Sequence, residues 1–140
     1  MATAIYARVS TQSEEQAHAL EQQLHRLRSK AAELGEPLVE FVDVASATKD
    51  KRPELKRLLA ACEKGELETV ICTRLDRMSR STVHGGQLLR MFNQKHWPNL
   101  ICLDQPIDLK TAAGRFYASL LMSLAQMESE MIGERVHHGQ

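Results

Sequence analysis

Arg8 and Ser10 lie two positions apart at the end of the first apolar run of the sequence, Ala4 to Val9. The run predicts a β-strand, in which successive side chains alternate between the two faces of a sheet. The odd-numbered residues from Ile5 to Val9 are expected to face the core, whereas Tyr6, Arg8 and Ser10 share the other side. A hydroxyl beside a guanidinium is suited to phosphate chemistry, because arginine binds phosphate oxygens in a planar, bidentate geometry.

A second charged cluster, Arg74 to Arg80, also follows an apolar run. The carboxyl ends of parallel strands lie at one edge of a sheet, where ligands bind, so the two clusters are expected to meet there. If this segment is helical, Arg77 and Arg80 share one face and Asp76 pairs with Arg80. The alternative is a solvated charge cluster on a loop. The arginine and serine that end the first strand favour a phosphate site.

The elements that must position these residues alternate between strand and helix. Ser13 to Gln16 has the pattern of a capping box, an amphipathic stripe follows as far as Leu34, and Gly35 and Pro37 end that helix. Strand, long helix, strand is a βαβ unit with a right-handed crossover. The predicted elements are strands over 4–9, 38–44, 69–73 and 99–103, a short edge strand within 105–109, and helices over 13–34, 53–64, from about 82 and over 111–138.

This order predicts an α/β fold: a three-layer sandwich with a mostly parallel sheet of four to five strands and helices on both faces. The segment Ala45 to Arg52 is small and polar, and is expected to be a mobile loop. The whole of 1–140 is expected to form one domain, because the length suits one core better than two.

The helix over 111–138 is longer than a domain of this size needs to cover its own sheet. Its apolar stripe runs from Ala113 through Phe116, Leu120 and Leu124 to the methionines near its end. We expect the far end of this helix to pack against another chain; an ordinary helix with a frayed end is the alternative.

Composition narrows the range of functions. The chain carries 18 Lys and Arg against 18 Asp and Glu, a net charge of zero. A domain that grips nucleic acid by bulk electrostatics is therefore disfavoured, whereas a small, locally basic site remains open. No apolar run approaches the roughly 20 residues that span a bilayer. The N-terminus lacks a signal pattern, so the cytoplasm is the expected compartment and no membrane partner is expected.

Metal ions and nucleotide cofactors have no support in the sequence. The six histidines lack the spacing of a zinc pair, and neither a P-loop nor a dinucleotide fingerprint is present. The three cysteines, Cys62, Cys72 and Cys102, sit among apolar neighbours and are expected to be buried free thiols. We expect no metal and no cofactor.

Several motifs together resemble the catalytic domain of serine site-specific recombinases, the resolvase/invertase family. The resemblance covers essentially the whole chain, in order and at the family's spacings. Its motifs are Tyr6-Ala7-Arg8-Val9-Ser10-Thr11, Ala19-Leu20-Glu21-Gln22-Gln23, Lys51-Arg52-Pro53-Glu54-Leu55, Leu75-Asp76-Arg77-Met78-Ser79-Arg80-Ser81, the segment 106–115, Ala125-Gln126-Met127-Glu128 and Ile132-Gly133-Glu134-Arg135.

The resemblance implies that Ser10 attacks a DNA phosphodiester, leaving a 5′-phosphoserine and a free 3′-hydroxyl. Strand exchange and religation would follow without ATP. No histidine is placed to act as a base, so activation by arginine electrostatics is expected. Arg8, Arg77 and Arg80 would bind the phosphate, and Arg52, on its mobile loop, could complete the site on assembly.

The roles of the remaining candidates follow from the same resemblance. Asp76 either passes a proton to the leaving 3′-oxygen or orients Arg80, and orientation is favoured. Gln23 and Tyr6 are expected to contact and position the catalytic residues rather than the DNA. Arg135 either touches DNA or is surface charge. The implied partners are DNA, a second copy through 111–138, and a tetramer in the active synapse.

The sequence departs from the family pattern in three places. Ala45 to Thr48 replaces the usual Ser-Gly, Ser129 stands where an arginine is usual, and Gly133 costs a helix about 1 kcal/mol relative to alanine. These changes bear on DNA contacts and dimer stability rather than on the chemistry. The family's separate DNA-binding region is expected to lie outside this chain. Another phosphodiester-cleaving enzyme and a non-catalytic dimerisation module are the alternative functions.

Overall fold

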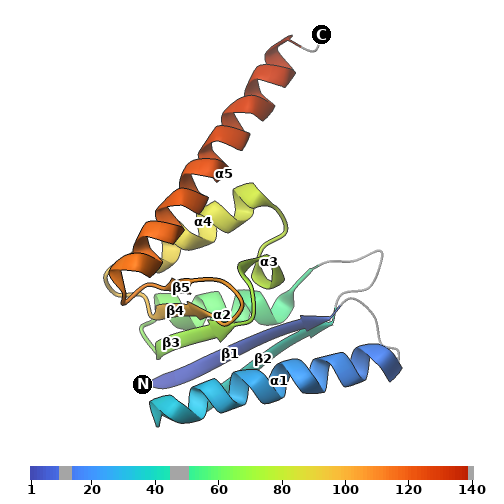
Figure 1. Cartoon of the computed structure of the whole chain (residues 1–140), viewed down its shortest axis with the longest axis vertical. Helices are drawn as coiled ribbons and strands as arrows, with labels where there is room; N and C mark the ends of the chain where they lie inside the picture. Colours follow the sequence, from blue (N-terminus) through green and yellow to red (C-terminus); the bar gives the residue numbers. More distant parts are fainter. Residues whose placement is uncertain (10–13, 45–50, 139–140) are drawn as a thin grey trace.

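A five-stranded sheet forms the centre of the protein, and helices cover both of its faces (Figure 1). The computed structural model describes residues 1–9, 14–44 and 51–138, with only the backbone described for the last three. The strands are β1 (Ala2–Val9), β2 (Leu38–Val44), β3 (Leu67–Cys72), β4 (Asn99–Cys102) and β5 (Ile107–Asp108). Their order in the sheet is β2-β1-β3-β4-β5.

The first four strands are parallel and β5 is antiparallel to β4. The helices are α1 (Glu14–Leu34), α2 (Pro53–Glu63), α3 (Leu75–Met78), α4 (Thr82–Phe92) and α5 (Ala112–His138). The predicted three-layer α/β sandwich, its mostly parallel sheet and its long C-terminal helix are therefore confirmed.

β1 is buried on both faces because it is an inner strand. Ile5 and Ala7 pack against α1 with Leu24 and Leu27, whereas Tyr6 lies in the core on the opposite face and is 0% exposed. The alternation along the strand is as predicted. The expectation of a single core-facing side is wrong, since parallel sheets covered by helices bury both of their faces.

Sequence signals at the helix ends correspond to the observed boundaries. Gly35 and Gly65 follow α1 and α2 with φ of 71° and 74°, a left-handed conformation that glycine adopts at low cost. Ser81 caps α4, because its Oγ accepts a hydrogen bond from the His84 amide. The predicted cap residue of α1, Ser13, and most of the predicted mobile loop (45–50) lie outside the described residues.

α5 leaves the body of the domain after its first half (Figure 1). Gly114, Ala118 and Ala125 are buried, whereas every residue from Gln126 to Arg135 is exposed. The start of the helix lies directly against β5: a Cβ added at Gly114 would collide with the backbone carbonyl of Asp108. The crossing with α4 is also close, since a Cβ at Gly86 would lie 2.5 Å from that of Ala125.

Candidate active site

The carboxyl ends of β1, β2 and β3 meet at one edge of the sheet, as the sequence predicted. Arg8 is the penultimate residue of β1 and pairs in register with Asp43 on β2. The Gln23 side chain of α1 reaches the same place, where its Oε1 accepts the Arg8 backbone amide at 3.4 Å. Ser10 follows β1 by one residue in the sequence and lies outside the described residues.

Asp43 is a buried carboxylate that joins β1, β2 and α2. It is 4% exposed, and its oxygens accept the Tyr6 hydroxyl at 2.7 Å and the amides of Glu54 and Leu55 at 3.0 Å. Burial, and then the hydrogen bond to Asp43, raise the pKa of Tyr6 far above its usual range. Tyr6 is therefore a protonated donor that holds Asp43, and Asp43 in turn caps the start of α2.

Arg52 is the residue immediately before α2, and it has a left-handed backbone with φ 47° and ψ 58°. Such a conformation is uncommon for a residue with a side chain and costs of order 1 kcal/mol or more. The Arg52 side chain is buried, and its guanidinium donates to the backbone carbonyl of Met78 at the end of α3. The sequence predicted that Arg52, on a mobile loop, could complete the site on assembly; in this structure its side chain already contacts the end of α3.

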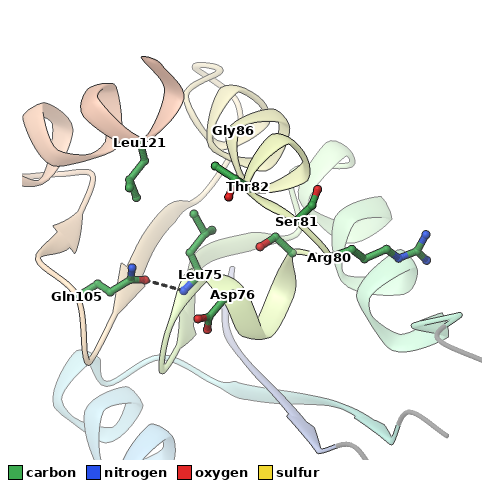
Figure 2. A pocket seen from close by; sticks show the side chains of 10 residues that line it. Leu75, Asp76, Arg80, Ser81, Thr82, Gly86, Gln105 and Leu121 are labelled. Carbon is green, nitrogen blue, oxygen red and sulfur yellow. Dashed lines mark hydrogen bonds between the residues drawn. The ribbon is translucent and has the colours of Figure 1, made fainter. Parts of the chain in front are cut away.

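α3 is a single helical turn that carries Asp76 and Arg77, and both of these side chains are exposed. At its start, the Leu75 amide donates to Oε1 of Gln105 at 2.7 Å, the contact drawn in Figure 2. At its end, Ser79 is extended, with φ −90° and ψ 155°. The segment is therefore helical for one turn only.

The predicted pairing of Asp76 with Arg80 is wrong. Because the helix ends at Met78, Arg80 does not follow on the same helical surface, and its side chain extends away from Asp76 (Figure 2). Asp76 instead accepts from Nε of Arg74 at 3.5 Å. Both partners of this pair are substantially exposed, so it contributes little to stability.

His84 is a residue at this edge that the sequence analysis did not include. Its Nδ1 accepts the backbone amide of Arg80 at 2.9 Å, and its own amide donates to Ser81. Burial, followed by the charges of Arg80 and Arg52, lowers the pKa of His84. The neutral imidazole with an unprotonated Nδ1 is thus the form that can accept the Arg80 amide, and this hydrogen bond fixes the backbone of Arg80.

A cavity of about 360 Å³ lies beside α3. Its lining comes from α3, from the segment 79–86, from Gln105 and from Leu121 of α5 (Figure 2). Part of the surface of α3 therefore faces this cavity, whereas its Leu75 and Met78 side chains are buried in the core.

Arg135 is exposed in the second half of α5, where it lines an open hollow with Thr82, Leu124 and Met131. The exposed apolar residues of α5 form the predicted stripe: Phe116 is 66% exposed, and Leu120, Leu124, Met127, Met131 and Ile132 are between 43% and 53% exposed. Ser129, where the family usually has an arginine, is also exposed.

The three cysteines are buried free thiols, as predicted. Cys72 and Cys102 lie side by side on β3 and β4 with their sulfurs 3.4 Å apart, and this contact together with burial holds the pKa of Cys72 well above its usual range. Within the described ranges, no group of three or more His, Cys, Asp or Glu side chains is arranged to hold a metal ion. Of the helices in those ranges, none combines the length and apolar character needed to cross a bilayer.

The structure thus brings Arg8, Gln23, Arg52, Arg80 and the α3 residues to one edge, and leaves Arg135 on the protruding helix. Sequence reasoning missed three residues: Asp43, His84 and Gln105. A carboxylate inside the apolar run of β2 was a usable signal for Asp43, since buried charges are rare unless paired. Nothing local marked Gln105, whose contact with Leu75 spans 30 residues.

Arginines gathered around a strand end, with a neutral histidine and a buried carboxylate behind them, can bind an anion and stabilise charge that develops on it. The chain as a whole is neutral, so this positive character is local.

The chain is similar in sequence to a family of known proteins. Residues 3–140 match the family described as "Resolvase, N terminal domain". The chain is 37% identical over 134 residues to a DNA-invertase of Escherichia phage P1, covering 96% of this chain and 66% of the invertase. It is 32% identical over 99 residues to the transposon Tn917 resolvase of Enterococcus faecalis, covering 71% of this chain and 52% of the resolvase. The chain thus spans between half and two thirds of the length of these relatives.

Two solved structures are similar over nearly the whole chain. The N-terminal catalytic domain of TP901-1 integrase superposes with a TM-score of 0.78 at 30% identity, covering 94% of this chain and 98% of that domain. A resolvase family site-specific recombinase from Streptococcus pneumoniae superposes with a TM-score of 0.81 at 25% identity, covering 99% of this chain and 95% of that chain.

Proposed function

Because the chain belongs to the resolvase N-terminal domain family, as a serine recombinase catalytic domain, we propose that it cuts and rejoins DNA through Ser10. The Ser10 oxygen forms a bond to the phosphorus of a DNA phosphodiester, and the bond from phosphorus to the 3′-oxygen breaks. The products are a 5′-phosphoserine linkage and a 3′-hydroxyl, which takes up the proton. After strand exchange, the 3′-hydroxyl reverses the attack.

The gathering of arginines beside the end of β1 is the observation that carries this proposal. Arg8, Arg77 and Arg80 would bind the phosphate oxygens and stabilise the charge of the transition state, as arginines do in phosphoryl transfer. Arg52 would act mainly indirectly, by donating a hydrogen bond to the Met78 carbonyl and so holding the end of α3 in place. One phosphodiester is exchanged for another, so the reaction needs no ATP, and we propose that it needs no metal ion.

Supporting roles are proposed for the neighbouring residues. Gln23 holds the backbone of Arg8, and Tyr6 holds Asp43. Asp76 pairs with Arg74 rather than with Arg80, which disfavours a role in orienting Arg80 and leaves the other proposed role, passing a proton to the leaving 3′-oxygen. Arg135 would contact DNA from α5.

We also propose that two copies associate through α5, and that the active synapse is a tetramer. The stripe Phe116, Leu120, Leu124, Met127 and Met131 recurs every three or four residues, so it lies along one side of the helix. The buried residues Gly114, Ala118 and Ala125 lie on a different side, toward the body. A continuous exposed apolar stripe of this kind is typical of a protein interface.

The proposed chemistry is tested with the natural protein that contains this chain and DNA bearing its crossover site, nicked beside the cut. The nick lets the short fragment that carries the new 3′-hydroxyl dissociate, so religation is prevented and the covalent adduct accumulates. We expect a denaturant-resistant protein–DNA adduct that forms in the presence of EDTA and maps to Ser10. Ser10→Ala should abolish it, while binding to the site remains.

Other outcomes separate the alternatives. Cleavage without an adduct, or cleavage that requires Mg²⁺, would identify a different phosphodiester-cleaving enzyme. Specific binding with no cleavage under any condition would indicate a non-catalytic dimerisation module.

A further inference from the structure

α3 is too short to hold itself in place. One helical turn fixes several backbone dihedrals for about one hydrogen bond, so an isolated turn is unfavourable. Its position must come from the groups that bind its two ends. Arg52 holds the Met78 carbonyl at the end of the turn, and Gln105 holds the Leu75 amide at its start.

Gln105 lies in the connection between β4 and β5, which runs beside the start of α3. The Leu103 amide donates to the Cys72 carbonyl at 3.0 Å, and the Asp104 amide donates to the Thr73 carbonyl at 2.8 Å. These two backbone hydrogen bonds hold the connection against the end of β3. The 2.7 Å hydrogen bond from the Leu75 amide to Gln105 then links the connection to the helical turn. Beyond that contact, the side of the turn toward α5 borders the 360 Å³ cavity.

The same connection also supports α5. It continues into β5, whose Asp108 carbonyl lies so close to Gly114 that no Cβ fits between them. Gln105 therefore lies in a short run of chain that touches the start of the long helix at one end and α3 at the other.

We propose that Gln105 is a positioning residue for the DNA-cleaving site: by accepting the Leu75 amide proton, it sets the placement of α3 and hence of Asp76 and Arg77. This inference rests on the proposed function. In this role Gln105 is not itself part of the catalytic machinery. It acts through α3, so its loss slows the chemical step and leaves DNA binding in place.

The test compares Gln105→Met, which keeps the length of the side chain but removes the acceptor, with Gln105→Glu, which keeps an acceptor oxygen at the same reach. Adduct formation is followed in single turnover on the nicked crossover site at saturating protein. We expect Gln105→Met to slow adduct formation about tenfold or more, because small displacements of catalytic groups have large effects on rate. Gln105→Glu should restore most of the rate, and both variants should bind the site as the wild type does.

Gln87→Met on α4 is the matched control, because it makes the same replacement at an exposed glutamine elsewhere, and it should leave the rate unchanged. Hydrogen exchange at the Leu75 amide, measured by NMR, gives an independent readout and should be faster in Gln105→Met than in the wild type, Gln105→Glu or Gln87→Met. If Gln105→Met fails to fold, Gln105→Asn keeps the amide but withdraws the acceptor, and it should show the same slow adduct formation.

The inference is overturned if wild type forms the adduct and the folded Gln105 variants form it equally fast. It is also overturned if Leu75 exchange is the same in all of the proteins. Failure of the wild type to form any adduct would instead reject the proposed function, and the exchange measurement would still decide whether Gln105 holds α3.

Discussion

The hydroxyl of Tyr6 donates a 2.7 Å hydrogen bond to Oδ2 of Asp43, a contact between residues 37 apart in the sequence. Both residues are buried, and the same carboxylate accepts the first two amides inside α2. One hydrogen-bonded carboxylate thus joins the strand that leads to Ser10 with the helix that begins beside Arg52.

Tyr6→Phe should lower the free energy of unfolding by about 2 kcal/mol, because it removes one donor from a buried carboxylate and leaves the ring in place. Urea unfolding monitored by circular dichroism measures the change. Tyr117→Phe is the control: among the described residues its hydroxyl makes no hydrogen bond, so its effect should be small. Equal effects of the two substitutions would contradict the importance assigned to the Asp43 contact.

Gly86→Ala should destabilise the chain by about 1 to 3 kcal/mol, because the new Cβ would lie 2.5 Å from that of Ala125 and would force α4 and α5 apart. Gly133→Ala is the matched control. A Cβ there meets nothing within 4 Å, so the substitution should stabilise α5 by up to about 1 kcal/mol.

The double variant Gly86→Ala with Ala125→Gly tests the cause of the stability lost in Gly86→Ala, since it removes the Ala125 Cβ with which the new Cβ collides where α4 and α5 cross. It should recover part of the stability lost in Gly86→Ala. No recovery, measured by the same urea titration, would place the origin of the loss elsewhere.

The stability of the chain should fall with decreasing pH through the titration of His84. The folded state lowers the pKa of His84 below its ordinary value of about 6.5, so the unfolded chain binds more protons in this window. The contribution is complete above about pH 6.5 and is lost as the pH falls through the folded pKa. Protonation also places a hydrogen on Nδ1, which ends its acceptance of the Arg80 amide.

His84→Asn isolates this titration, because the asparagine oxygen can accept the same amide and does not titrate. Unfolding midpoints measured between pH 5 and 7.5 should depend on pH less in the variant than in the wild type. The other histidines are common to both proteins and cancel in the difference. Identical pH profiles would exclude His84 as the titrating group.

Leu120→Glu should weaken the proposed association through α5 on the order of 10-fold to 100-fold, because it places a charge in the middle of the apolar stripe. Sedimentation equilibrium measures the monomer–dimer constant. Gln126→Glu adds the same charge to the same helix near Arg90 and should leave the constant almost unchanged. A wild-type chain that sediments as a monomer at all concentrations would contradict the proposed dimer.

The sequence predicted the fold well wherever local chemistry decides the structure. The bounds of β2 were predicted without error, because Gly35, Pro37 and the small polar residues after Val44 delimit the apolar run. The cap at Ser81 and the glycines after α1 and α2 likewise act through their immediate neighbours.

The fine structure of the site depends instead on contacts between distant residues. The two ends of α3 are bound by Gln105 and Arg52, which lie 30 and 26 residues from their partners, so the local pattern of Arg74 to Arg80 does not include these contacts. For that reason the sequence placed Asp76 beside Arg80, whereas the fold pairs it with Arg74. Two of the three residues that the sequence analysis missed, Asp43 and Gln105, act through contacts of the same long-range kind, whereas His84 acts on Arg80 only four residues away.

The burial of every cysteine gives the chain a built-in probe of its own opening. Cys62 lies on α2, whereas Cys72 and Cys102 lie on neighbouring strands at the centre of the sheet. A thiol-modifying reagent can reach each group only when the surrounding layer separates, so its labelling rate reports the free energy of that separation. If α2 detaches before the sheet opens, Cys62 will be modified first, and the order of labelling will show which layer separates most readily.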